Sequence, residues 1–279
     1  MINPTRMPKS WYSKRLAGVG SLILGSLLFS ACGATVEPPK PVYLTAAGST
    51  TMTPLVEELA LAFQERQPSV TIEVDGGGSR LGQDLAAAGQ TDLGLTSWLA
   101  DGPPDGLQAT VIARDGIALI VHPTNPITGL TLLQAHDLFA GRTAYWQELG
   151  APLGPVQAVS REDGSGTRAA FESVVMAGDR VTLTALVMPN SQAVVDYVAS
   201  DPTAIGYVSM GYVDGSVRPL PIEGLLPTPD NVSRGEYHLT RELILLSKPR
   251  AQPEVRGFLE FALSPAGQAI VARRYGRVR

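Results

Sequence analysis

The sequence contains a single cysteine, Cys32, so no disulfide can form within the chain. Its three histidines, His122, His136 and His238, lack the spacing of metal ligands, and we interpret them as surface or packing residues. Charged residues make up only 17% of the chain, aromatic residues 6% and hydrophobic residues 44%. This composition is that of an ordinary globular protein, and 279 residues are enough for two lobes of roughly 100 residues or more each.

Apolar runs approaching the length of a membrane span are also missing, except near the N-terminus. Four basic residues precede an apolar run over residues 16–29, which is followed by Ser30, Ala31 and Cys32. The run has about 14 residues and is interrupted by glycines, so it is short for a membrane span. The layout is typical of a bacterial lipoprotein signal peptide over residues 1–31, with lipid on Cys32 and a tether over residues 32–41. A transmembrane anchor or an ordinary secretory peptide is the alternative.

The remaining chain is acidic. Residues 1–31 contain four of the 22 basic residues and none of the 26 acidic ones, which leaves a net charge of −8 with neutral histidines. Such a surface repels nucleic acid. Any anion site must therefore consist of local donors aimed at the ligand.

Apolar strands and helical patterns alternate along the chain, which predicts an α/β class with a largely parallel sheet. The first helix is expected to have Thr53 as its N-cap and Pro54 as its first residue. Two long apolar strands, near residues 116–126 and 237–247, bracket the middle of the chain. We therefore expect lobe I over residues 42–118 and 239–279, and lobe II over residues 119–238.

Three loops rich in glycine and hydroxyl side chains each follow an apolar strand and open a helix. They are Gly48-Ser49-Thr50-Thr51, Gly76-Gly77-Gly78-Ser79 and Gly164-Ser165-Gly166-Thr167. The start of a helix has unpaired N–H groups and the positive end of the helix dipole, so it favours an anion. Glycine lets the backbone approach closely, and Ser or Thr adds an O–H donor. One such loop is often a plain capping turn, but three of them divided between two lobes indicate an anion site.

Other glycine-loop sites do not fit the sequence. The third glycine of a dinucleotide fingerprint that starts at Gly76 would fall on Leu81, and no Gly-Lys-Ser/Thr of a nucleoside triphosphatase loop occurs. The segment 163–167 begins like a calcium loop but lacks the later acidic ligands. The sequence also offers no G-x-S-x-G elbow, metal cluster or placed carboxylate pair, which disfavours an enzyme such as a phosphatase or hydrolase.

Several segments occur in the order seen in a known family: "AAGSTTMTPLVEELALAF", "GGGSRLGQDL", "TDLGLTS", "ARDGIALIVHPTNP", "SREDGSGTRAAFE", "AIGYVS" and "YHLTRELIL". The chain resembles PstS-type phosphate-binding lipoproteins, the receptors of ATP-driven phosphate importers, over nearly all of residues 42–279. The resemblance implies a two-lobed periplasmic-binding-protein fold of type II, with a mostly parallel sheet and flanking helices in each lobe. It also implies an extracytoplasmic, lipid-anchored monomer that needs no cofactor, catalyses no reaction, and binds phosphate and the permease subunits of an ABC importer.

The resemblance further implies the residues of the site. The phosphate contacts would be Thr50, the amide of Thr51, Ser79, Arg161, Ser165, the amide of Gly166 and Thr167, with Ser49 and Ser97 nearby. Arg161 would supply the one full charge, able to bind two oxygens in parallel. Asp163 resembles the acidic partner that holds this arginine. We expect Arg80 and Arg168 to be exposed.

One position departs from the family. After the serine that matches Ser97, some members carry an aspartate that accepts the proton of hydrogen phosphate and others carry an arginine, whereas this chain has Trp98. Without that aspartate, discrimination against sulfate is in doubt. A receptor for sulfate, molybdate or another oxyanion is therefore one alternative, and an accessory phosphate-sensing or adhesion lipoprotein is another. We expect Trp98 to pack at the rim of the cleft.

Overall fold

The computed structural model describes residues 40–278 of the chain. The predicted signal peptide, Cys32 and most of the tether lie outside the described residues. Within the described range, no helix has both the length and the apolar character required to cross a bilayer.

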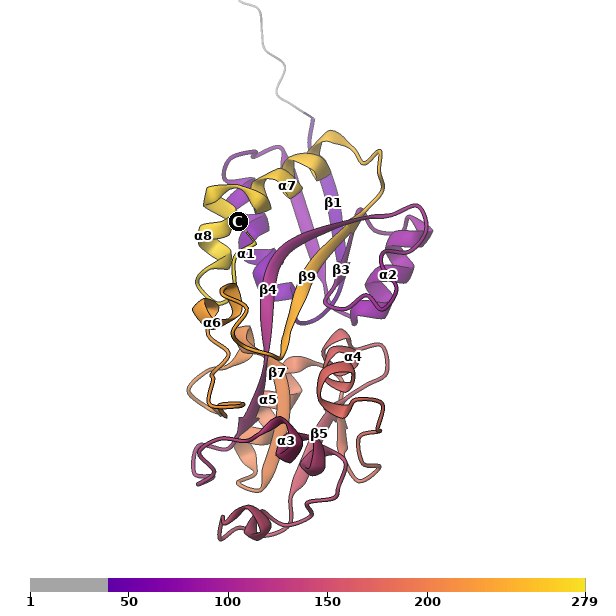
Figure 1. Ribbon diagram of the computed structural model, residues 1–279. Coiled ribbons are helices and arrows are strands. Elements are labelled where there is room, and N and C mark those ends of the chain that lie inside the picture. The colour runs from indigo at the N-terminus through magenta and orange to yellow at the C-terminus, as the bar shows by residue number, and fades with distance from the viewer. Residues whose placement is uncertain (1–39, 279) are drawn as a thin grey trace, which may run out of the picture. The chain divides into compact units, whose positions relative to one another are not determined.

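The described residues alternate strands and helices, as the sequence predicts (Figure 1). The strands are β1 (Val42–Gly48), β2 (Val70–Asp75), β3 (Leu93–Thr96), β4 (Gln108–Val121), β5 (Gln157–Arg161), β6 (Leu186–Met188), β7 (Ala204–Ser209), β8 (Arg218–Pro219) and β9 (Thr240–Ser247). The helices are α1 (Thr53–Gln64), α2 (Ser79–Ala88), α3 (Leu132–Phe139), α4 (Gly166–Phe171), α5 (Ser191–Ser200), α6 (Pro229–Ser233), α7 (Pro253–Leu263) and α8 (Pro265–Val271). A π-helical segment, Glu172–Met176, continues α4.

The strands follow the order β2-β1-β3-β9-β4-β7-β5-β6, with β8 beside β4. Pairing is parallel from β2 through β1 to β3 and from β7 through β5 to β6, and antiparallel where β9 and β4 join these two groups. Strand β4 pairs with β9 as far as Gly116 and with β7 from Ile117 onward, so it passes from one group into the other (Figure 1). The predicted two-lobed α/β fold is confirmed, and the antiparallel pairs lie where the chain crosses between the groups.

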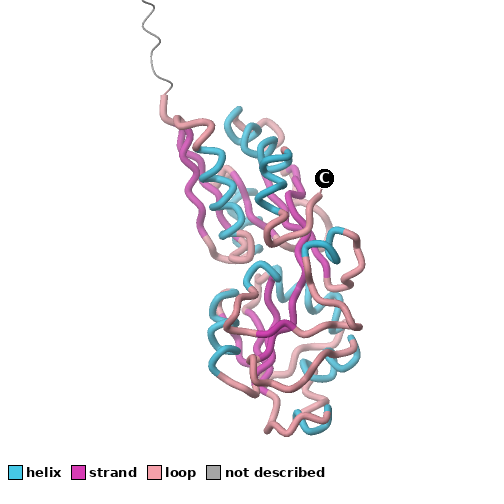
Figure 2. Tube along the Cα trace, turned by 90° about the vertical axis from the view of Figure 1, so that its left-hand side faces the viewer, coloured by secondary structure: helices cyan, strands magenta, loops and turns pink. Residues whose placement is uncertain are grey.

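Helices lie against the strands on each side of this junction (Figure 2). The largest cluster of buried apolar side chains contains residues of both strand groups. In the first group, Phe63 of α1 packs against Phe258 and Phe261 of α7, with ring centroids 5.6 and 5.7 Å apart. In the second group, Phe171 of α4 stacks on Tyr207 of β7 at 4.0 Å. These contacts fix α1 and α4, which follow the first and third glycine-rich loops.

Two predicted element boundaries are wrong because tertiary contacts determine the backbone conformation there. Helix α1 begins at Thr53 and has Met52 as its N-cap, so the predicted Thr53 cap is wrong. Met52 already has helical backbone angles, and the Thr53 hydroxyl donates back to the Ser49 carbonyl at 3.4 Å. Strand β4 begins at Gln108, well before the predicted start at Gly116, because its first half pairs with β9.

Gly82 gives a stability prediction for the first group. A Cβ at this position of α2 would lie 2.5 Å from the Leu95 carbonyl oxygen and 2.8 Å from that of Ala47, because the helix rests directly on β1 and β3. We expect Gly82→Ala to lower the free energy of unfolding by about 1–3 kcal/mol. Urea unfolding measures this loss. Gly154→Ala, where the added Cβ meets no heavy atom within 4 Å among the described residues, is the control.

Candidate functional site

The three glycine-rich loops meet in space. The Thr51 and Thr167 hydroxyl oxygens, which belong to different strand groups, lie 3.0 Å apart. The Arg80 amide, just after the second loop, donates to the Gly164 carbonyl of the third loop at 3.2 Å. Loops that are far apart in the sequence therefore form one cluster between the two groups of strands.

The cluster is buried although it is polar. Six hydroxyl side chains are at most 3% exposed, namely Ser49, Thr51, Ser79, Ser97, Ser165 and Thr167. Buried hydroxyls must be hydrogen-bonded, and these bond mainly to one another. The Ser97 oxygen lies 3.2 Å from both the Ser49 and the Ser79 oxygens. The loops thus hold a compact set of hydroxyl groups that can act as donors or acceptors.

Gly166 allows the two sides to approach. A Cβ at this position would lie 2.3 Å from the Ser79 hydroxyl oxygen and 2.5 Å from that of Ser97. No side chain larger than hydrogen fits between these atoms. Helix α4 begins at Gly166, and the Ser165 hydroxyl caps it by accepting a hydrogen bond from the Arg168 amide at 3.3 Å.

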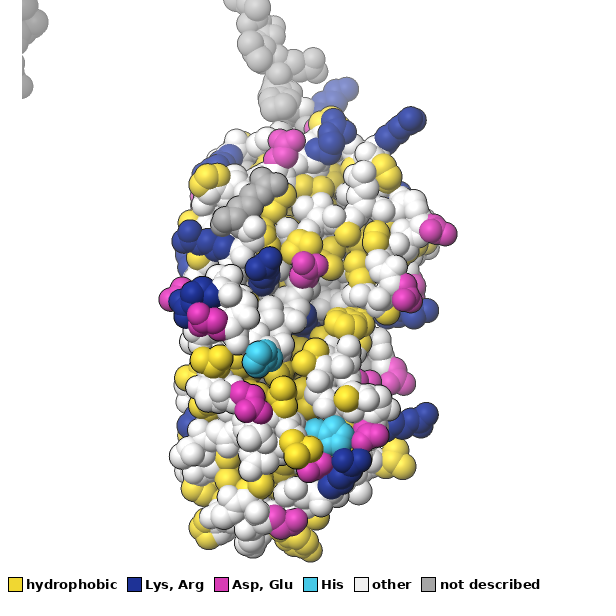
Figure 3. All heavy atoms as spheres, viewed as in Figure 1, with side chains coloured by type: hydrophobic (Ala, Val, Ile, Leu, Met, Phe, Trp, Pro, Cys, Tyr) yellow, Lys and Arg dark blue, Asp and Glu magenta, His cyan; other side chains and the backbone are white. Residues whose placement is uncertain are grey.

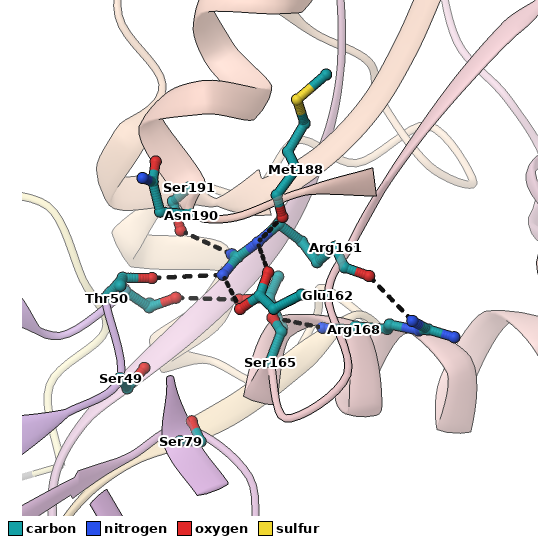
Figure 4. A network of polar contacts seen from close by, with 12 residues as sticks. Ser49, Thr50, Ser79, Arg161, Glu162, Ser165, Arg168, Met188, Asn190 and Ser191 are labelled. Atoms are coloured by element: carbon teal, nitrogen blue, oxygen red, sulfur yellow. Dashed lines mark hydrogen bonds and ion pairs between the residues drawn. The ribbon is translucent and has the colours of Figure 1, made fainter. Parts of the chain in front are cut away.

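Arg161 reaches the cluster from the end of β5 and is 1% exposed. Its Nη2 donates to the Thr50 hydroxyl across the junction at 3.5 Å, and Nη1 donates to the Ser191 hydroxyl at 3.2 Å (Figure 4). The preceding residue helps to fix this strand end, because the Ser160 hydroxyl is 2.7 Å from the Tyr207 hydroxyl. Burial raises the pKa of Tyr207 to about 12, so this phenol stays neutral at ordinary pH.

Known proteins share this arrangement of strands and loops. A PBP superfamily domain model matches residues 35–266. The phosphate-binding protein PstS of Bacillus subtilis is 30% identical over 241 residues, which cover 84% of this chain and 80% of that protein. This chain belongs to the PstS family.

Two solved structures agree with this assignment. One, from Clostridium perfringens, is described as a phosphate ABC transporter substrate-binding protein with bound phosphate. It matches with a TM-score of 0.81 and 37% identity, over 85% of this chain and all of its own. An ABC-type phosphate transport receptor from Vibrio cholerae matches with a TM-score of 0.70 and 30% identity, over 84% of this chain and 99% of its own.

In this PstS-family chain, the partner predicted for Arg161 is wrong. Arg161 pairs with Glu162, whose two carboxylate oxygens accept from Nε at 2.9 Å and from Nη2 at 2.8 Å (Figure 4). Asp163 instead pairs with Arg168 at 2.7 Å, and its side chain is 94% exposed. The turn carries Asp163 outward before Gly164, whose φ of +89° reverses the chain.

Arg80 and Arg168, which follow the second and third glycine-rich loops, differ in the exposure of their side chains. Arg80 is exposed, as predicted, and pairs with Asp84 at 3.4 Å. Arg168 is more buried than predicted, because its guanidinium contacts Glu172 at 2.8 Å and the Arg161 carbonyl at 3.1 Å. It therefore supports the loop that carries Arg161.

A second guanidinium also reaches the PstS-family cluster, so Arg161 is not its only full charge. Arg241 of β9 donates to the Ser97 hydroxyl at 3.2 Å and to the Thr51 hydroxyl at 3.3 Å. It is paired with Asp115 of β4, a fully buried carboxyl whose pKa is raised by burial while the Arg241 charge opposes that rise. The sequence signal for this pair is two adjacent opposite charges within each of two apolar strands, Arg114-Asp115 and Arg241-Glu242. Because side chains alternate between the faces of a strand, one charge of each couple faces the core and requires a partner there.

Trp98 is expected from the sequence to pack at the rim of the cleft. It is half-buried, packs against the main core and lines a cleft of about 670 Å³ beside the loops. Other residues of that cleft include Gly77, Ser79 and the segment 163–166.

The face of the molecule in Figure 3 carries basic and acidic side chains that are interspersed. This distribution agrees with an anion site that consists of local donors.

Proposed function

We propose that this protein is an extracytoplasmic solute-binding protein that captures inorganic phosphate between two lobes and delivers it to an ABC permease. The observation that carries the proposal is the meeting of three glycine-rich loops, with buried hydroxyls and a buried arginine, between the two strand groups. The names of its relatives as phosphate-binding proteins and phosphate transport receptors support the choice of ligand. Such a protein makes or breaks no bond.

The proposed contacts come from both sides of the junction. Lobe I would contribute Thr50, the amide of Thr51 and Ser79; lobe II would contribute Arg161, Ser165, the amide of Gly166 and Thr167. Neutral donors and one or two guanidinium groups bind an anion strongly when water is excluded, even on an acidic protein. Arg161 has capacity for this role, because Nη1 carries two hydrogens and donates to one acceptor, Ser191, among residues 40–278.

We place lobe I at residues 42–118 and 239–279, and lobe II at residues 119–238. The change of partner along β4, from β9 at Gly116 to β7 at Ile117, supports a boundary there. An anion that contacts both lobes would favour the closed arrangement by the difference between its affinities for the closed and open states.

Membrane attachment is proposed through lipid on Cys32 after removal of residues 1–31. We expect the wild-type protein to incorporate labelled fatty acid in a bacterial host and to fractionate with membranes. Cys32→Ser should lose the label because the acceptor thiol is gone. Equal labelling of the two proteins would exclude this anchor.

Calorimetric titration of the protein from Gly33 onward tests the ligand. We expect one phosphate per chain, bound more tightly than sulfate or molybdate at each of two pH values. The motive for including sulfate is Trp98, which replaces a family aspartate that accepts a proton. Sulfate binding as tight as phosphate binding would favour the alternative receptor.

Glu162 and Asp163 provide a matched pair of acidic residues. Because Glu162 holds two guanidinium nitrogens of Arg161, Glu162→Ala should weaken phosphate binding about fivefold through loss of a positioned donor. Asp163→Ala, which removes an exposed partner of Arg168, should stay within about twofold of wild type. The opposite order of effects in calorimetry would restore Asp163 as the partner of Arg161.

A further inference from the structure

The buried ion pair between Arg241 and Asp115 has no place in the predicted phosphate contacts. The two residues face each other across β4 and β9, and Asp115 Oδ2 accepts from Nε at 2.9 Å and from Nη2 at 2.7 Å. Both side chains are almost fully buried. A buried pair is often no more stabilising than apolar residues of the same volume, so its presence calls for another role.

The pair lies at the junction of the two strand groups. Gly116, next to Asp115, is the last residue of β4 that pairs with β9, and Ile117 pairs with Ser209 of β7. The Ser209 hydroxyl donates to Asp115 Oδ1 at 2.7 Å. Asp115 therefore fixes Arg241 with respect to both groups.

Arg241 also determines the direction of the hydrogen bonds that Thr51 and Ser97 make with their neighbours, through its Nη1 and Nη2 groups. A guanidinium can only donate, so the Thr51 and Ser97 oxygens that it contacts must accept. Each of these hydroxyls then has to direct its own hydrogen elsewhere. The Ser49 hydroxyl already donates to the Ser97 oxygen at 3.2 Å, so the remaining partners are the Thr167 oxygen, 3.0 Å from Thr51, and the Ser79 oxygen, 3.2 Å from Ser97.

The hydrogen-bond direction imposed by Arg241 leaves the Thr167 and Ser79 hydroxyls free to donate to a ligand. In this direction of donation, Thr167 accepts from Thr51 and Ser79 accepts from Ser97. The Ser97 amide also donates to the Ser79 oxygen at 3.1 Å. Because each of these oxygens accepts from a neighbour, Thr167 and Ser79 each keep one hydrogen to donate to a further partner. Both are proposed phosphate contacts, and an anion requires donors.

We propose that Arg241 is a positioning residue of the phosphate site, which sets the hydrogen-bond direction through Thr51 and Ser97 so that Thr167 and Ser79 present hydrogens to the anion. This inference rests on the proposed function. Arg241 itself does not touch the phosphate. Its ion pair with Asp115 holds it at the lobe junction. There it contacts Thr51 and Ser97 directly and acts on Thr167 of the other lobe through Thr51.

The test is a double-mutant cycle in phosphate affinity, measured by calorimetry with unfolding curves on every variant. In Asp115→Asn/Arg241→Gln the pair is neutral, and the new amide can also accept, so the direction is no longer fixed. We expect phosphate binding about tenfold weaker. Adding Thr51→Val to this neutral-pair variant should raise the Kd for phosphate by a much smaller factor than the product of the two separate factors. Both changes break the same chain of hydrogen bonds, so their effects on the binding free energy are not additive. Arg241→Lys, which keeps a cation that only donates, should recover part of the affinity.

Wild type and Arg234→Gln, which removes an exposed pair with Glu236, are the controls. Absence of phosphate binding by wild type would overturn the proposed function itself. Unchanged affinity in the folded neutral-pair variant, or additive effects in the cycle, would overturn the role of Arg241 alone. If the variants fail to fold, a phosphate complex of wild type decides: Arg241 must contact Thr51 and Ser97 while Ser79 and Thr167 contact the phosphate. Direct contact between Arg241 and phosphate would refute the relay.

Discussion

Arg161→Ala is expected to weaken phosphate binding by about 2 kcal/mol or more, which is roughly a 30-fold rise in Kd. The wild-type guanidinium is buried, reaches Thr50 across the lobe junction and is held by Glu162 and Ser191. Its removal deletes a full charge and leaves the Glu162 carboxylate beside the anion without a counter-charge. Calorimetric titration of variant and wild type measures the difference.

Arg80→Ala is the matched control for Arg161. Arg80 also follows a glycine-rich loop, but its side chain is 75% exposed and pairs with Asp84 of its own helix. Such surface pairs contribute little, so the change should leave affinity within about twofold. Unchanged affinity in Arg161→Ala would remove this arginine from the site.

Gly166→Ala is the second change with a large expected effect. The added methyl carbon would lie 2.3 Å from the Ser79 oxygen, 2.5 Å from the Ser97 oxygen and 3.0 Å from the Ser79 Cβ. Those serines cannot withdraw easily, because they bond to each other and Ser97 also accepts from Arg241. We expect phosphate affinity to fall by at least about 30-fold, since the lobes can no longer meet as they do in wild type.

The stability of the separate lobes should change little in Gly166→Ala, because the clash lies between them. Gly154→Ala, in a loop of lobe II where a Cβ meets no described heavy atom within 4 Å, should bind phosphate like wild type. Small-angle scattering with and without phosphate would show compaction on binding in the control and not in Gly166→Ala. Full compaction of Gly166→Ala would exclude this steric account.

Much of the fold follows from local signals in the sequence. Strand–loop–helix units are visible because glycines and hydroxyl residues interrupt apolar periodicity. Helices α2 and α4 begin at Ser79 and Gly166, within loops that the sequence predicts to open helices. The clustering of three loops could also be predicted, because each follows a strand that the α/β pattern places in a common sheet. The identity of the ligand is predicted from the resemblance of the motifs to one family and not from these local signals.

The remaining features depend on contacts that one sequence does not specify. Arg241 and Asp115 are 126 residues apart and meet only because β4 and β9 pair in one particular register. Whether Glu162 or Asp163 faces Arg161 depends on the turn at Gly164, and neighbouring acids look equivalent in the sequence. Ser191 lies at the start of α5, so its contact with Arg161 follows from packing between distant elements.

A crystal structure of the protein from Gly33 onward, grown with phosphate, tests the central claim most directly. The account predicts one phosphate between the lobes, within hydrogen-bonding distance of Thr50 and Ser79 on one side and of Arg161 and Ser165 on the other. Phosphate bound to a single lobe, or bound at the surface while these loops contact only each other, would contradict it.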